Sequence, residues 1–142
     1  MAGLYVNNMK RQVIHIPKYE WKVYVYYDTT PYDTEELLGK LRSLGCSESG
    51  VLRTRKQLLR GGYNNGFTYS NHALKQSVVS LGRASEFAQF LNSFVHELQH
   101  LSTHIAQAYG MPLDGEEICY LSGWIAQEMY PILIHYLTRC GL

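Results

Sequence analysis

The stretch VHELQHLSTHIAQAYGMPLDGEEICYLSG, Val95–Gly123, decides the architecture of the second half of the chain. Apolar residues recur at helical spacing over residues 85–109, the pattern of a helix that buries one face. Gly110, Pro112 and Gly115 indicate that this helix ends in a turn. A second helix is predicted from about residue 116 to 137. The stretch therefore predicts a helical hairpin that spans about residues 85–137.

The first half of the chain is predicted to be mainly β. WKVYVYY, Trp21–Tyr27, places Trp21, Val23, Val25 and Tyr27 on one face of a strand. Together with Arg11–Ile16 it is expected to form a hairpin. Further strands are expected over Val51–Leu59 and Phe67–Leu81, with a turn-rich loop between them.

One helix is expected within this first half. Asp33 is predicted to cap it, with Glu36 at the capping-box position and Gly45 at its end. The 142 residues match the usual size of one domain. The elements together predict a single α+β domain over residues 1–142, in which a mainly antiparallel sheet is packed on one side by the two C-terminal helices.

The composition indicates which partners the protein does not bind and in which compartment it is expected. The formal net charge of +1 shows no electrostatic footprint for nucleic acid or an anionic membrane. The sequence contains no run of about 18 apolar residues, the length that a membrane-spanning helix needs. The odd number of cysteines, Cys46, Cys119 and Cys140, is not that of a disulfide framework and indicates a reducing compartment. We expect a cytoplasmic protein, and the sequence does not indicate its oligomeric state.

Residues His96, Glu97 and His100 form an H-E-x-x-H pattern within the first predicted C-terminal helix. Residues i and i+4 share one helix face, so both imidazoles can point at one metal ion. Glu97 can then reach a water on that metal and act as general base. His104 continues the series, but three histidines over eight residues span about 12 Å of helix, too far for one ion.

A catalytic zinc site needs a third protein ligand, and the second C-terminal helix offers carboxylates for it. If Asp114 is its N-cap, Glu117 occupies the capping-box position, which leaves Glu116 as the preferred ligand. Glu117 remains an alternative. Glu128 is another, because it lies more nearly level with the histidines in an antiparallel hairpin.

With these residues the chain resembles the zincin metallopeptidases of the gluzincin type. The last third is also similar to small H-E-x-x-H proteins of Bacteroidetes phages and prophages, in which a run like GEEICYLSGWIA follows the motif. The resemblance implies a minimal zincin-like domain, with His96, His100 and Glu116 as zinc ligands and Glu97 as the catalytic acid/base. It departs from the thermolysin-like pattern at Tyr120, where those enzymes have an aspartate that orients a zinc-bound histidine.

The predicted function is that of a zinc-dependent hydrolase, a peptidase acting on a peptide or protein substrate. A strand near Lys75–Leu81 is expected at the sheet edge, where an extended peptide could pair with it. The first alternative is a catalytically silent zincin-like module of phage or mobile-element origin that binds metal and a partner protein. The second is that no metal binds and the histidines lie on a polar helix face.

Overall fold

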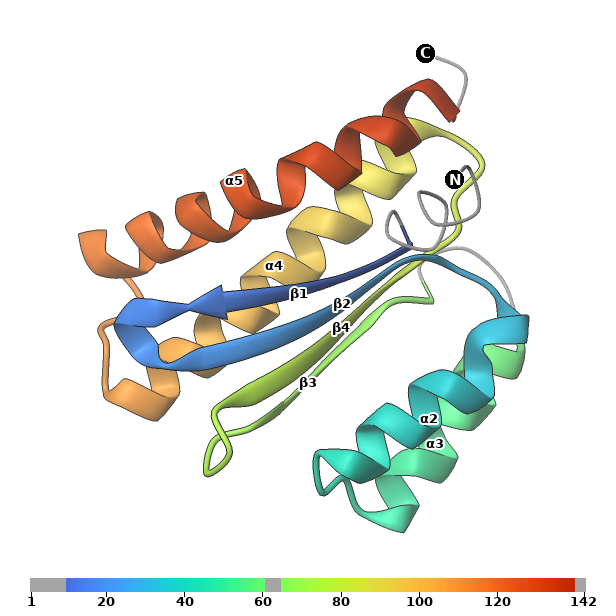
Figure 1. Ribbon diagram of the computed structural model, residues 1–142, viewed down its shortest axis with the longest axis horizontal. Helices are drawn as coiled ribbons and strands as arrows, with labels where there is room; N and C mark the ends of the chain where they lie inside the picture. Colours follow the sequence, from blue (N-terminus) through green and yellow to red (C-terminus); the bar gives the residue numbers. More distant parts are fainter. Residues whose placement is uncertain (1–9, 61–64, 140–142) are drawn as a thin grey trace.

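The computed structural model describes residues 10–60 and 65–139, which form a four-stranded mixed sheet between two layers of helices (Figure 1). The strands lie in the order β1-β2-β4-β3. The elements are β1 (Arg11–Ile16), β2 (Trp21–Thr29), α2 (Thr34–Ser43), α3 (Glu48–Arg60), β3 (Phe67–Asn71), β4 (Gln76–Gly82), α4 (Phe87–Tyr109) and α5 (Glu116–Arg139), with 3-10 turns at η1 (Pro17–Tyr19) and η2 (Pro31–Asp33).

The sheet combines both kinds of strand pairing. The predicted hairpin is confirmed, since β1 and β2 pair antiparallel with Arg11 opposite Tyr26. The central pair, β2 and β4, is parallel, and β3 pairs antiparallel with β4. The prediction of an edge strand near Lys75–Leu81 is wrong, because β4 has a neighbour on each side and β3 is the edge strand.

Helices cover both faces of the sheet, so the prediction of packing on one side is wrong. The alternation of Trp21–Tyr27 is observed, with Trp21, Val23, Val25 and Tyr27 in the core beneath α4 and α5. The opposite face carries Tyr24 and Tyr26, which pack with α2 and α3 in a second core. Two large aromatic side chains on that face need apolar cover, which the α2–α3 pair supplies.

The segment Val51–Leu59 is part of helix α3, not the predicted strand. Its composition, rich in leucine, arginine, lysine and glutamine, favours helix. Val51 and Leu58 are buried, and their spacing of seven residues puts them on one helix face. The segment Phe67–Leu81 forms two strands, because a turn that contains Lys75 in the left-handed region (φ 54°) divides it.

Asp33 occupies the N-cap position of α2, as predicted, but its side chain makes no capping hydrogen bond there. The Asp33 carboxylate instead accepts a hydrogen bond from the backbone N–H of Thr30 and completes a capping box around η2. Glu36 is not in that box and instead pairs with Arg11 on β1. Gly45, with φ 81°, follows the helix where the sequence places its end.

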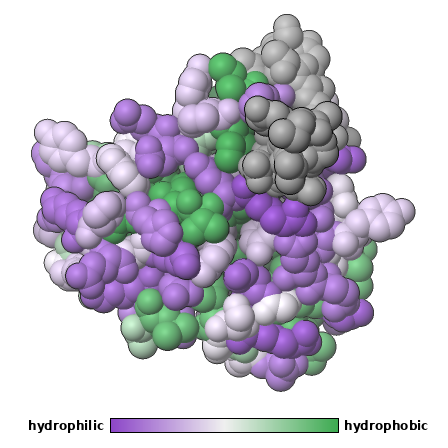
Figure 2. Space-filling view, viewed as in Figure 1, coloured by the Kyte–Doolittle hydropathy of each residue, from purple (hydrophilic) through white to green (hydrophobic). Residues whose placement is uncertain are grey.

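The predicted C-terminal hairpin is confirmed as α4 and α5, joined by a short turn in which Gly110 adopts φ 65°. No described helix is long and apolar enough to cross a membrane. On the face seen in Figure 2, apolar surface is broken into patches among hydrophilic side chains.

The second core can be tested with a pair of leucine substitutions. Leu38 on α2 is fully buried, whereas Leu52 on α3 is 61% exposed. Leu38→Ala is expected to lower the free energy of unfolding by about 2–5 kcal/mol, and Leu52→Ala to change it by less than about 0.5 kcal/mol. Urea denaturation measures both, and equal small effects would contradict packing of α2 on the sheet.

Candidate functional site

His96 and His100 lie on the exposed side of α4, next to the flank that contacts strand β3 through Glu97 and His104. The Nε2 atoms of His96 and His100 are 3.2 Å apart, and both residues are exposed to solvent. The rings meet nearly edge to face, with centroids 4.8 Å apart. The i, i+4 spacing thus brings the two imidazole nitrogens together, as the sequence predicted, and the structure places them at the surface.

The separation of the two nitrogens fits a shared metal ion. Zinc–nitrogen bonds of about 2.0–2.1 Å at tetrahedral angles place two ligand nitrogens about 3.3 Å apart. The same separation also suits a hydrogen bond between two neutral imidazoles, one as donor and one as acceptor. The distance between the two nitrogens is therefore compatible with a shared ion and equally with a direct hydrogen bond.

Glu97 points from α4 toward the edge of the sheet and is 6% exposed. Its Oε1 accepts a hydrogen bond from the Thr68 hydroxyl on β3, at 2.8 Å. Gly66 permits this approach, because a Cβ there would lie 2.6 Å from the Ser80 carbonyl oxygen and 3.3 Å from Glu97 Oε2. Sequence reasoning missed Gly66 and Thr68, because the turn-rich loop predicted before Phe67 indicated no contact with Glu97.

A pocket of about 260 Å³ opens beside this carboxylate. Its lining comes from α3, α4 and the approach to β3, and comprises Gln57, Gly66, Asn92, Ser93, His96 and Glu97. The Gln57 amide donates to the carbonyl oxygen of Gly66, which ties α3 to this wall. One imidazole of the histidine pair and the buried carboxylate therefore face the same polar hollow.

The predicted third ligand, Glu116, does not lie beside the histidines. The Ser122 hydroxyl on α5 donates to the Ser102 hydroxyl at 2.7 Å, which sets the register of the hairpin. Ser102 lies about 200° round α4 from His100, so the histidines point away from α5. Along the axis, Glu116 lies eight residues beyond the level of His100, about 12 Å.

The two alternative ligands also belong to α5. Glu117 accepts a hydrogen bond from the Tyr19 hydroxyl, at 2.7 Å. Glu128 is level with His96 in the observed register, but His96 lies about 120° round α4 from Ser102, so its side chain is turned away from α5. Across residues 10–60 and 65–139, no group of three or more His, Cys, Asp and Glu side chains is arranged to hold a metal ion. The structure brings His96, Glu97 and His100 together, and none of the three candidate carboxylates with them.

His104 lies one helical turn beyond His100 on α4 and is more buried than His96 and His100. Its Nδ1 is 2.8 Å from the Ser70 hydroxyl on β3, and the Ser70 and Ser77 hydroxyls lie 2.6 Å apart. The Trp21 indole N–H donates to the Ser77 hydroxyl and is the last member of this series of hydrogen bonds. Burial, with His100 and His72 nearby, lowers the pKa of His104 below its usual value. His104 is thus a neutral, hydrogen-bonded side chain at pH 7 that couples α4 to the sheet.

Comparison of the chain with protein-family models, with curated proteins and with solved structures gave no match.

The histidine pair predicts a measurable metal affinity. We expect zinc binding, measured by isothermal titration calorimetry, to weaken by more than about ten-fold in His96→Ala and in His100→Ala, because each removes one of two paired nitrogens. His15→Ala, an exposed histidine on β1, is the matched control and should bind zinc as the parent does. Unchanged zinc binding in both site variants would exclude this pair as the ligands.

The contact between Thr68 and Glu97 predicts a stability effect that does not depend on metal. Thr68→Val keeps the shape of the side chain but removes the hydroxyl donor from a buried carboxylate. It is expected to lower the free energy of unfolding by about 1–3 kcal/mol. Thr68→Ser retains the hydroxyl donor and is expected to lower the free energy of unfolding clearly less than Thr68→Val does. Urea denaturation of the two variants at pH 7 measures the difference, and equal costs would argue against the hydrogen bond.

Proposed function

We propose that this chain is a zinc-dependent hydrolase, with a peptide as its substrate, in which His96 and His100 hold the zinc ion and Glu97 is the general base. The observation that carries the proposal is the 3.2 Å separation of the two Nε2 atoms beside a buried carboxylate. His96 and Glu97 line one pocket, so a bound metal and a base would act on the same volume.

Glu97 is suited to move a proton in that pocket. The Thr68 hydroxyl holds Oε1, which fixes the carboxylate and leaves Oε2 to accept a proton from a water molecule. Zinc, when bound, supplies a lowered pKa for its water and polarises the substrate carbonyl. Glu97 would then return the proton to the departing amine, as general acid.

A peptide substrate is supported by the position of β3. This strand ends the sheet and lies against the flank of α4 that carries His104 and Glu97, next to the histidine pair. The edge of a sheet offers main-chain donors and acceptors that an extended peptide can pair with. A peptide bound along β3 would therefore pass close to the proposed catalytic residues.

In this proposal the remaining metal coordination comes from the β3 side of α4 or from water, because α5 lies on the opposite side. The ligand predicted from the sequence, Glu116, is exposed at the start of α5. Glu116→Ala is therefore expected to keep its zinc and any peptidase activity. Metal content by elemental analysis, after dialysis against zinc-free buffer, measures this. Loss of zinc in Glu116→Ala would show that Glu116 completes the site in solution.

A second function is favoured by one observation: the described residues supply two converging ligands, whereas catalytic zinc sites usually have three protein ligands. The chain would then be a metal-binding interaction module without turnover. Substitution of the proposed base separates the two functions, since a module does not need Glu97 to activate water.

The test is hydrolysis of a fluorogenic peptide library by the zinc-loaded protein. Glu97→Gln is expected to lower kcat by about 10²–10⁴-fold, the usual contribution of general base catalysis, while it keeps the zinc. Glu128→Gln, an exposed carboxylate on α5, is the matched control and should be fully active. Zinc-loaded parent protein that hydrolyses no member of the library would favour the interaction module.

A further inference from the structure

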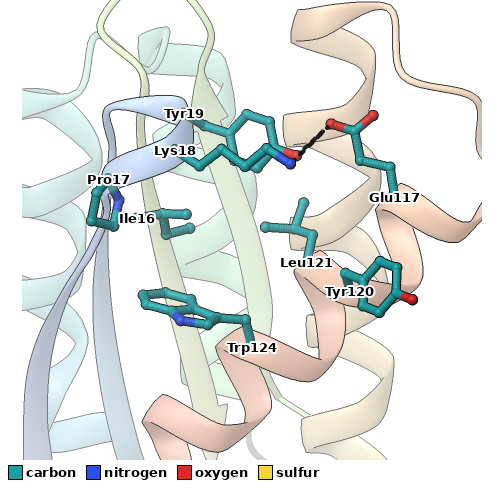
Figure 3. Close-up of a pocket in the computed structure, with 8 residues that line it drawn as sticks. All are labelled: Ile16, Pro17, Lys18, Tyr19, Glu117, Tyr120, Leu121 and Trp124. Carbon is teal, nitrogen blue, oxygen red and sulfur yellow. Dashed lines mark hydrogen bonds and ion pairs between the residues drawn. The ribbon is translucent and has the colours of Figure 1, made fainter.

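A second pocket lies at the opposite edge of the sheet from the histidines, where the turn between β1 and β2 meets the start of α5 (Figure 3). Its volume is about 410 Å³, within the range of small-molecule sites. The lining residues are Ile16, Pro17, Lys18, Tyr19, Glu117, Tyr120, Leu121 and Trp124. None of them belongs to α4 or β3, so this pocket is separate from the proposed catalytic site.

The body of the pocket is apolar. Ile16 and Leu121 are almost fully buried and form facing walls, with the half-buried Trp124 indole between the strand and the helix. An indole face and branched aliphatic groups suit an aromatic ring or a large aliphatic side chain. The interior therefore selects an apolar group of about the size of one large amino-acid side chain.

The rim carries two opposite charges side by side. Lys18 Nζ lies 3.7 Å from Glu117 Oε1, and both side chains are well exposed, at 72% and 49%. The Tyr19 hydroxyl donates to the same carboxylate oxygen. Burial and the Glu117 carboxylate raise the pKa of Tyr19 to about 12, so the phenol stays protonated and keeps donating at pH 7.

Tyr109 on α4 holds this rim in place. The Tyr109 hydroxyl at the end of α4 donates to the backbone carbonyl of Tyr19. The rings of Tyr19 and Tyr109 also pack together, with centroids 5.1 Å apart. Tyr19 in turn fixes the Glu117 carboxylate, so one of the two charges is positioned before any ligand arrives.

We propose that this pocket binds a free amino acid with a large apolar side chain. Its carboxylate would pair with Lys18, its ammonium with Glu117, and its side chain would lie between Ile16, Leu121 and Trp124. Charge complementarity supports this ligand, since a ligand with one charge meets one partner and one like charge at this rim. A zwitterion meets a partner for each of its charges. A free amino acid carries both charges on the carbon that bears its side chain.

Intrinsic fluorescence offers a direct test, because Trp124 lines the pocket whereas Trp21, the other tryptophan, is 1% exposed in the core. The probes are L-phenylalanine, 3-phenylpropionate, which lacks the ammonium, and 2-phenylethylamine, which lacks the carboxylate. Saturable change with L-phenylalanine is expected, with each analogue binding about two- to five-fold more weakly, the usual worth of an exposed ion pair. Equal binding of all three, or no saturable change with L-phenylalanine, would overturn the proposal.

Two variants check the rim. Lys18→Met and Glu117→Gln are each expected to weaken L-phenylalanine binding by about two- to five-fold. Both residues are exposed, and glutamine still accepts the Tyr19 hydrogen bond, so the fold should persist. The matched controls are Lys56→Met on α3 and Glu116→Gln on α5, both exposed and outside the lining, and both should bind as the parent does. Equal affinity of the rim variants and the controls would overturn the assignment, whatever the outcome at the histidine site.

Discussion

Burial of strand β2 on both of its faces is the constraint on which the rest of the structure depends. Trp21, Val23, Val25 and Tyr27 face the α4–α5 hairpin, while Tyr26 faces α2 and α3. A strand buried in this way needs a hydrogen-bonded neighbour on each side and a helical layer above and below. The chain meets this need with β1 and β4 as neighbours and with two pairs of helices.

The candidate site depends on how α4 packs against strand β3. Thr68 on β3 donates a hydrogen bond to the Glu97 carboxylate, and the Ser70 hydroxyl on β3 lies within hydrogen-bond distance of His104. Glu97 and His104 are turned toward β3, whereas His96 and His100 lie further round the helix, at the surface. The proposed base is therefore buried and the proposed ligands are exposed, an arrangement that suits a site open to substrate.

Some of this could be predicted from the sequence, and the failures have physical reasons. The H-E-x-x-H spacing correctly predicted that His96 and His100 converge, because the helical repeat alone determines it. The preference for Glu116 rested on capping and chain proximity, and neither determines how α5 is rotated about α4. Val51–Leu59 was predicted as a strand although its composition favours helix. Which of its residues are buried, Val51 and Leu58, depends on packing in the second core with Tyr26 of β2.

The sequence by itself determined the local periodicities: the alternation of β2, the hairpin of α4 and α5, and the pairing of His96 with His100. These depend on backbone geometry over a few residues. Only the tertiary structure decided which strand lies at the edge and that the histidines point away from α5. It also decided that Thr68 donates a hydrogen bond to Glu97 and that Gly66 leaves room for this carboxylate. Those features depend on contacts between residues that are distant in the chain, such as Ser102 with Ser122 and Thr68 with Glu97, and no local pattern specifies such contacts.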